Sequence, residues 1–255
     1  MELYWRFISG DPGLGNPLSG HYDPLYVAIS IFIASLAGFT SFSIAERVNS
    51  SKEKSVRRRW SLAGAVTMGT GIWAMHFTGM LAFSMNGTDH NQIRYELFTT
   101  LLSVLPAILG SGIAIHHMAH RTAGWLKLQI GIFSMALGIG SMHYTGMEAM
   151  RMQCIIRYDI TLFIMSIVVA HLLSWIAFYV NITLRRKYED ASEFLKIGAS
   201  LLVGCSVAGM HYTAMAAAEF YHGDGSFEPG LVLPPFWLAI GICVVVSMVI
   251  ALTVI

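Results

Sequence analysis

The chain has 255 residues, of which 55% are hydrophobic and only 12% are charged. Soluble domains carry about 25% charged residues, so this composition excludes an ordinary water-soluble protein. The net charge of +1 gives no general attraction to nucleic acid, and we expect no nucleic-acid partner.

Seven stretches are long and apolar enough to span a bilayer, which takes about 20 residues of helix. Because only closed hydrogen-bonding structures persist in lipid, stretches of this length predict helices. Residues 1–23 precede the first stretch, mix aromatic residues with Gly, Pro and Asp, and are expected to form an extracytoplasmic lip. The predicted spans lie near residues 24–48, 61–85, 95–117, 125–149, 159–183, 195–220 and 234–255.

The distribution of Lys and Arg predicts the orientation of these spans. Cytoplasmic loops of membrane proteins are enriched in basic residues, and the loops after the first, third and fifth spans hold 12 of the 16. We therefore expect a multi-pass membrane protein, with its N-terminus outside and its C-terminus in the cytoplasm. The 12 residues are Arg47, Lys52, Lys54, Arg57, Arg58, Arg59, Arg121, Lys127, Arg185, Arg186, Lys187 and Lys196.

A six-residue motif recurs three times, late in each even-numbered span. Two spans per copy keep all copies parallel, and parallel repeats are related by an axis along the membrane normal. The predicted fold is an all-α membrane protein of seven transmembrane helices. Three tandem two-helix repeats (24–85, 95–149 and 159–220) have a pseudo-threefold arrangement, and 234–255 is a seventh connector helix. The copies are Met75-His76-Phe77-Thr78-Gly79-Met80, Met142-His143-Tyr144-Thr145-Gly146-Met147 and Met210-His211-Tyr212-Thr213-Ala214-Met215.

Each motif presents an imidazole and a thioether on one helix face. The His and the Met four residues later lie within about 40° of each other, and the small residue before that Met favours close approach of another helix. Packing alone asks for similar volumes, not for the same His–Met spacing three times, and polar residues in membranes mark function. The predicted ligands are therefore His76, His143, His211, Met80, Met147 and Met215, with Met75, Met142 and Met210 as possible additional ligands.

This ligand set favours copper, because thioether is a soft ligand that suits Cu(I), whereas zinc prefers thiolate, imidazole and carboxylate. Haem held by two histidines is the alternative, but it would use only two of the three copies. One shared centre, two centres or three separate centres all satisfy the motif.

The three motif copies resemble the bacterial MHYT sensor domain, an integral membrane module, and the resemblance covers essentially the whole chain. The chain departs from the family pattern only at Phe77, which replaces the usual Tyr. The resemblance implies copper binding through the motif His and Met residues and sensing of a diatomic gas such as O2, NO or CO. It also implies location in the bacterial inner membrane and fusion to cytoplasmic diguanylate cyclase and phosphodiesterase domains, or to kinase domains.

The functional prediction is a copper-binding sensory domain that detects a diatomic gas, redox state or copper itself. It is expected to signal through its seventh helix to a fused or associated cytoplasmic domain, with cyclic-di-GMP turnover as the output. The membrane domain itself is not expected to be an enzyme. A copper transporter or permease would need further ligands across the membrane, and a haem-binding redox protein is a second alternative. A homodimer is left open.

Overall fold

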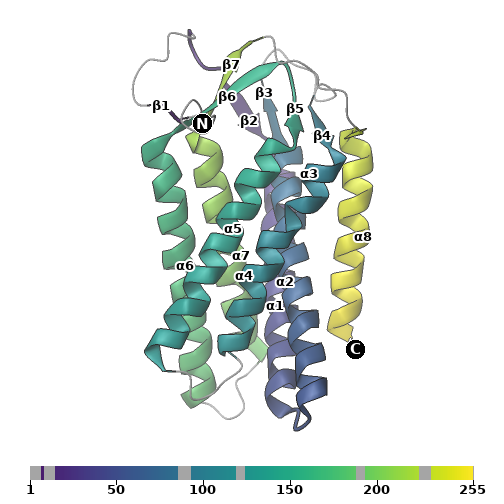
Figure 1. Ribbon diagram of the computed structural model, residues 1–255, viewed down its shortest axis with the longest axis vertical. Coiled ribbons are helices and arrows are strands. Elements are labelled where there is room, and N and C mark those ends of the chain that lie inside the picture. Colours follow the sequence, from purple (N-terminus) through teal and green to yellow (C-terminus); the bar gives the residue numbers. More distant parts are fainter. Residues whose placement is uncertain are drawn as a thin grey trace.

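The computed structural model describes residues 7–8, 15–85, 93–118, 124–187, 193–223 and 231–254. Long helices run side by side, and short strands gather at one end of the bundle (Figure 1). Of the predicted N-terminal lip, residues 1–6 and 9–14 lie outside the described part of the chain. The helices are α1 (Pro24–Ser50), α2 (Lys54–Ala82), α3 (Leu97–Leu102), α4 (Val104–Met118), α5 (Trp125–Glu148), α6 (Ile160–Lys187), α7 (Glu193–Ala217) and α8 (Pro235–Val254).

The all-α membrane fold is confirmed, with one helix less apolar than expected. Six helical segments of the described chain are long and apolar enough to cross a membrane, and α3 and α4 together form one of them, broken at Ser103 one turn before Pro106. Proline at that point cannot donate the backbone hydrogen bond that a continuous helix requires. The remaining long helix, α2, has 29 residues, and its Gly, Thr and His residues lower its mean hydropathy. It tolerates them because other helices, rather than lipid, surround it.

The helices form three antiparallel pairs, α1–α2, α4–α5 and α6–α7, which make the most extensive contacts in the molecule. The second helices of the pairs, α2, α5 and α7, each contact the other two and form an inner ring. The pairs join through α2 with α4, α5 with α6, and α7 with α1. The last of these contacts closes the ring. The last helix, α8, lies outside it against α2 and α1 (Figure 1).

Short strands, which were not predicted from the sequence, close each pair at the same end of the bundle. Strand β2 pairs with β3, β4 with β5, and β6 with β7, all antiparallel, so each unit is tied to itself beyond its helices. Two further short strands join the edges. The strands are β1 (Phe7–Ile8), β2 (Gly20–Tyr22), β3 (Phe83–Met85), β4 (Arg94–Glu96), β5 (Met150–Arg151), β6 (Cys154–Asp159), β7 (Ala218–His222) and β8 (Val232–Leu233).

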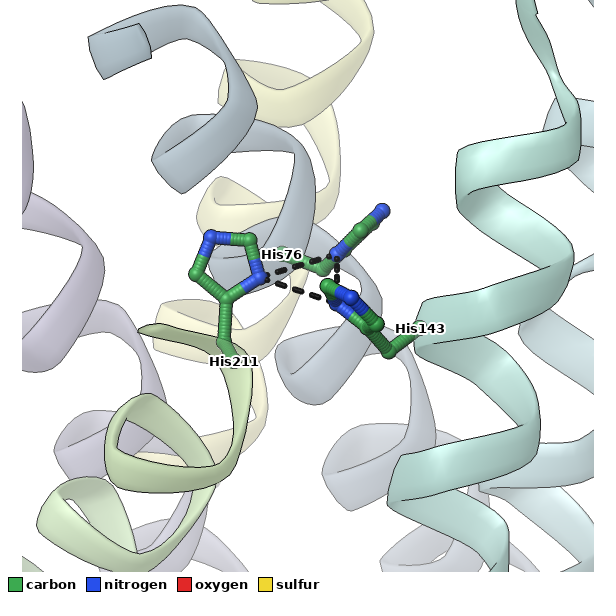
Figure 2. Close-up of side chains that lie close together, drawn as sticks. All are labelled: His76, His143 and His211. Atoms are coloured by element: carbon green, nitrogen blue, oxygen red, sulfur yellow. Dashed lines mark hydrogen bonds between the residues drawn. The ribbon is translucent and has the colours of Figure 1, made fainter. Parts of the chain in front are cut away.

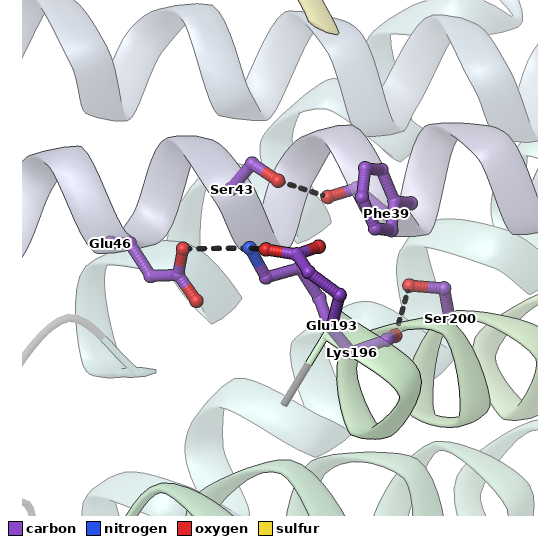
Figure 3. Close-up of polar contacts among 6 residues, drawn as sticks. All are labelled: Phe39, Ser43, Glu46, Glu193, Lys196 and Ser200. Atoms are coloured by element: carbon purple, nitrogen blue, oxygen red, sulfur yellow. Dashed lines mark hydrogen bonds and ion pairs between the residues drawn. The ribbon is translucent and has the colours of Figure 1, made fainter. Parts of the chain in front are cut away.

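The interface between α7 and α1, which closes the ring, carries an ion pair at the end opposite the strands. The Lys196 ammonium lies 2.9 Å from the Glu46 carboxylate and 3.4 Å from that of Glu193 (Figure 3). Its charge also lies 5.5 Å from the centre of the Phe39 ring. The Lys196 side chain is only 12% exposed, so these contacts hold a largely desolvated cation between the first and third units.

Helix α2 packs tightly on α1 at Gly71, where a Cβ atom would lie 2.1 Å from the Cβ of Ala37. We predict that Gly71→Ala forces the two helices apart and destabilises the protein by about 1–3 kcal/mol, the usual cost of overpacking. Gly198→Ala is the matched control, because Gly198 is also helical and has open space around its Cβ position. Thermal unfolding in detergent measures both variants. Equal melting temperatures would contradict the close contact.

Candidate metal centre

Three imidazoles meet between the inner helices. His76 on α2, His143 on α5 and His211 on α7 point their Nδ1 atoms at one another (Figure 2). The Nδ1 atoms of His76 and His211 are 3.1 Å apart, those of His143 and His211 are 3.1 Å apart, and those of His143 and His76 are 3.2 Å apart. All three side chains are at most 1% exposed. The structure thus brings the three repeated histidines to one buried point.

Hydrogen bonds among the rings cannot satisfy this triangle. A neutral imidazole nitrogen either donates through its hydrogen or accepts through its lone pair, but it does not do both. A closed ring of three bonds would need each Nδ1 to do both. At least one edge therefore sets two N–H groups or two lone pairs against each other, which is costly in a buried site. A cation at the centre removes the conflict, because all three nitrogens can then offer lone pairs.

The dimensions and the composition of the triangle fit a small metal ion. A point equidistant from nitrogens 3.1–3.2 Å apart lies about 1.8 Å from each, and metal–imidazole bonds are roughly 2.0–2.1 Å long. An opening of a few tenths of an ångström, or a slightly out-of-plane ion, makes the match. Among the described residues, these three histidines are the group that can hold a metal, and no carboxylate or thiol belongs to it.

The far side of two of the rings explains the small residue of the motif. A Cβ on Gly79 would lie 2.4 Å from the Nε2 of His211, and a Cβ on Gly146 would lie 2.4 Å from the Nε2 of His76. The glycine of one motif therefore accommodates the imidazole of a neighbouring motif, whereas the sequence suggested the approach of another helix. The third copy has Ala214 at this position. Each Nε2 is buried without a hydrogen-bond partner.

All six motif methionines belong to the buried core. The three predicted ligands that follow the histidines are 1–3% exposed, and the three that precede them are at most 1% exposed. One of these side chains extends to a neighbouring helix of the inner ring: the terminal methyl of Met210 on α7 lies 3.7 Å from the Cβ position of Gly140 on α5. The methionines are Met80, Met147 and Met215, and Met75, Met142 and Met210.

Two of the motif threonines form hydrogen bonds within their own helices. The hydroxyls of Thr78 and Thr213 donate to the carbonyls of Ala74 and Gly209 on their own helices, at 2.7 Å each. Such bonds satisfy a hydroxyl in an apolar bundle. The hydroxyl of the motif Tyr instead reaches another helix, as described below.

Sequence reasoning missed a second recurring pattern, a Tyr followed by an acidic residue directly before the first helix of each unit. The rings of Tyr22, Tyr95 and Tyr158 pack edge-on against the motif aromatics of other units. This pattern could have been found in the sequence, because each of these tyrosines stands eight residues before a serine of a predicted span.

Comparison with known proteins places this site in a family. The family model described as "Bacterial signalling protein N terminal repeat", or MHYT, matches residues 69–131, 137–191 and 204–255. The chain belongs to the MHYT family. Each match begins within a motif helix, α2, α5 or α7, and extends through the first helix of the next pair or, for the third match, through α8. The first two matches thus join helices that are neighbours in the ring, whereas the third joins α7 to α8, which lies outside it.

The chain is similar to signalling proteins that are much longer. It is 38% identical over 238 residues to the bifunctional diguanylate cyclase/cyclic di-GMP phosphodiesterase MucR of Pseudomonas aeruginosa, covering 93% of this chain and 34% of that protein. It is 37% identical to the cyclic di-GMP phosphodiesterase NbdA of the same organism, covering 83% and 26%. It is 30% identical to the signaling protein YkoW of Bacillus subtilis, covering 78% and 24%. No solved structure matches the chain.

These matches confirm that the MHYT region is not itself the enzyme. The chain spans about a third or less of the length of these relatives, and the activities named for them lie in domains outside the matched region. The described part of this chain is accordingly a membrane signalling module.

The contact between the MHYT glycines and the neighbouring imidazoles gives a prediction. Gly146→Ala places a methyl group where the His76 ring now lies, and overpacking of this kind costs about 1–3 kcal/mol. In a His76→Ala background the same substitution should cost nothing, because the methyl then enters the space that the ring vacated. A double-mutant cycle of unfolding midpoints measures the difference, and Gly79→Ala with His211→Ala repeats the test. Additive effects would contradict the contact.

Proposed function

We propose that this MHYT domain is a copper-binding sensor that detects a diatomic gas, a redox change or copper itself and signals to a cytoplasmic domain. The observation that supports it best is the buried triangle of Nδ1 atoms of His76, His143 and His211. The histidines would hold the ion, and the methionines that follow them, Met80, Met147 and Met215, are the proposed sulfur ligands.

The absence of a carboxylate from this group of described residues favours a monovalent ion. The cost of burying a charge in a low-dielectric interior rises with the square of that charge, and three neutral imidazoles contribute no compensating charge. Cu(I) carries one positive charge and accepts imidazole and thioether, whereas zinc and calcium carry two. Haem would need two of the histidines on opposite faces of a macrocycle, which the mutual approach of the three nitrogens does not favour.

Such an ion would supply a soft centre that can take up a small ligand or change its oxidation state. The chain's own part is to link that centre to three helices at once, because each histidine comes from a different unit. A change in the preferred distances between the nitrogens would therefore displace α2, α5 and α7 relative to one another. Signalling requires that the ligand binds two arrangements with different affinity.

The output proposed for this chain is cyclic-di-GMP turnover. Two of the relatives described above carry names for synthesis or hydrolysis of this compound. Helix α8 packs on α2, which carries His76, and ends at the side away from the strands (Figure 1). Movement of α2 would therefore reach α8 directly, and we propose α8 as the connection to the output domain.

Metal analysis tests the copper site. The full chain, purified in detergent and loaded with Cu(I), should retain copper after dialysis, and the variant with His76, His143 and His211 all replaced by Gln should not, because the nitrogens are then lost. His171→Gln is the matched control: His171 is a membrane histidine on α6 whose Nδ1 also lacks a partner, but it lies outside the triangle. Competition with a coloured Cu(I) chelator gives the affinity.

Equal copper retention by the triple variant and the wild type would refute the site. Copper retention combined with transport of copper into vesicles would favour a permease over a sensor. Loss of copper in His171→Gln as well would show that the loss in the triple variant is not specific to the triangle, and the test would then count against the site.

The orientation is a second proposal. The hairpin between α1 and α2 carries Lys52, Lys54 and Arg57 at the end away from the strands, and we propose that this end faces the cytoplasm. A fluorescent protein fused after Ile255 should then fluoresce, while alkaline phosphatase at the same point should stay inactive, because phosphatase folds only outside the cytoplasm. The reverse pattern would overturn the orientation.

A further inference from the structure

A second pattern recurs with the threefold period of the MHYT motif. Each unit begins with Tyr, an acidic residue, six further residues and Ser, and no residue is inserted or lost in any copy. The copies are Tyr22-Asp23 with Ser30, Tyr95-Glu96 with Ser103, and Tyr158-Asp159 with Ser166. We call the Tyr and Ser of each copy an aromatic clasp.

The acidic residue of each copy fixes the start of a helix. Asp23 accepts a hydrogen bond of 2.8 Å from the backbone of Leu25, and Asp159 accepts one of 2.8 Å from that of Leu162. Glu96 accepts bonds from the backbones of two residues, Phe98 at 2.9 Å and Thr99 at 2.6 Å. These caps satisfy the free N–H groups of a helix start, so the Tyr before the cap and the Ser after it have fixed positions.

Each clasp receives the aromatic residue of a motif from another unit. The ring of Tyr158 lies edge-on to that of Tyr144, with centroids 5.5 Å apart, and the hydroxyl of Tyr144 lies 2.9 Å from that of Ser166. The same contacts join Tyr212 to Tyr22 at 5.5 Å and to Ser30 at 2.9 Å. The second unit is thus fastened to the third, and the third to the first.

The direction of these hydrogen bonds follows from a third repeated contact. In every clasp the Ser hydroxyl donates to the backbone carbonyl three residues earlier, at 2.7 Å. Its one hydrogen is therefore used, and the Tyr hydroxyl must be the donor between the units. The carbonyls belong to Val27, Thr100 and Phe163.

The clasped rings also pack against two of the three imidazoles. The Tyr144 ring lies edge-on to that of His143, with centroids 4.9 Å apart, and the Tyr212 ring lies edge-on to that of His211 at 4.7 Å. A shift of either Tyr would remove the support on one side of an imidazole whose other nitrogen has no hydrogen bond. The clasp thus stabilises both a contact between units and the orientation of a ring.

We propose that Tyr144 and Tyr212 are positioning residues: the clasp of the next unit holds each of them, and each in turn orients the histidine that precedes it. The orientation of each ring, and with it the geometry of the centre, then depends on how two units fit together. The effect on metal affinity rests on the proposed copper site, while the effect on the rings does not.

The first motif is the natural exception. Phe77 has no hydroxyl, yet its ring meets Tyr95 in the same edge-on way, at 5.7 Å. The clasp serine, Ser103, is present and fully buried. Here the indole of Trp73, one turn earlier on α2, donates to the carbonyl of Thr100 at 2.9 Å. A different bond therefore fastens the first unit to the second.

The test compares Tyr144→Phe and Tyr212→Phe with Tyr179→Phe in the full chain. Tyr179 lies on α6, is 48% exposed and stacks on Trp175, so its hydroxyl has no role at the centre. Nitrogen NMR of 15N-histidine-labelled, metal-free protein reports each imidazole, with the signals assigned by single His→Gln variants. Tyr144→Phe should shift the His143 signals most and Tyr212→Phe those of His211, while Tyr179→Phe shifts neither.

A double-mutant comparison with Ser166→Ala separates the clasp bond from a general loss of stability. If the hydrogen bond between Tyr144 and Ser166 orients His143, then Tyr144→Phe, Ser166→Ala and the double variant should all shift the His143 signals by the same amount. With Cu(I) as the probe, each variant should bind about three- to tenfold more weakly, the range expected for one lost hydrogen bond. Unchanged histidine signals in a variant with a lowered melting temperature would overturn the proposal and leave a purely structural role. Failure of the wild type to bind Cu(I) would refute only the copper site.

Phe77→Tyr provides a gain-of-contact test. The added hydroxyl should bond to Ser103, raise the melting temperature and alter the His76 signals, and Ser103→Ala should abolish the gain. A Phe77→Tyr protein that is folded but insensitive to Ser103→Ala would contradict the equivalence of the three clasps.

Discussion

The mutual approach of three buried imidazoles is the constraint on which the rest of the structure depends. Three neutral Nδ1 atoms 3.1–3.2 Å apart cannot all form hydrogen bonds with one another. Packing of the surrounding helices or a bound ligand therefore has to stabilise their approach. Glycines behind the rings, edge-on aromatics beside them and close helix pairs around them all serve this arrangement. The membrane helps, because it excludes the water that would otherwise hydrate the nitrogens.

Each unit contributes to a site that it cannot build alone. A unit supplies one histidine on its second helix, and its first helix holds the aromatic residue of another unit's motif. The strands tie a unit to itself, whereas the clasps tie it to its neighbour. The geometry of the imidazole triangle therefore depends on the arrangement of all three units, whereas three independent sites would not share this dependence.

Much of this arrangement could be predicted from particular residues. Apolar stretches located the helices, and the repeated His76, His143 and His211 predicted a common point, because residues at one position of parallel repeats share a depth. Other features could not be read in this way. The strands follow no strong local pattern, being two to six residues long. The partner of Gly146 could not be identified either, since the packing of an imidazole against it depends on how α2 and α5 are placed.

Closure of the ring through α1 and α7 also bears on how the protein is made. Ser30 on α1 and Tyr212 on α7 are 182 residues apart in the sequence. The face of α1 that contacts α7 therefore stays uncovered until α7 has been synthesised. A chain that leaves the ribosome from its N-terminus can complete the contacts within each pair early, but the trio of imidazoles forms only when α7 has entered the bilayer. Biogenesis of the site is thus a late, long-range event, and a chain that stops short of α7 would retain helices without a centre.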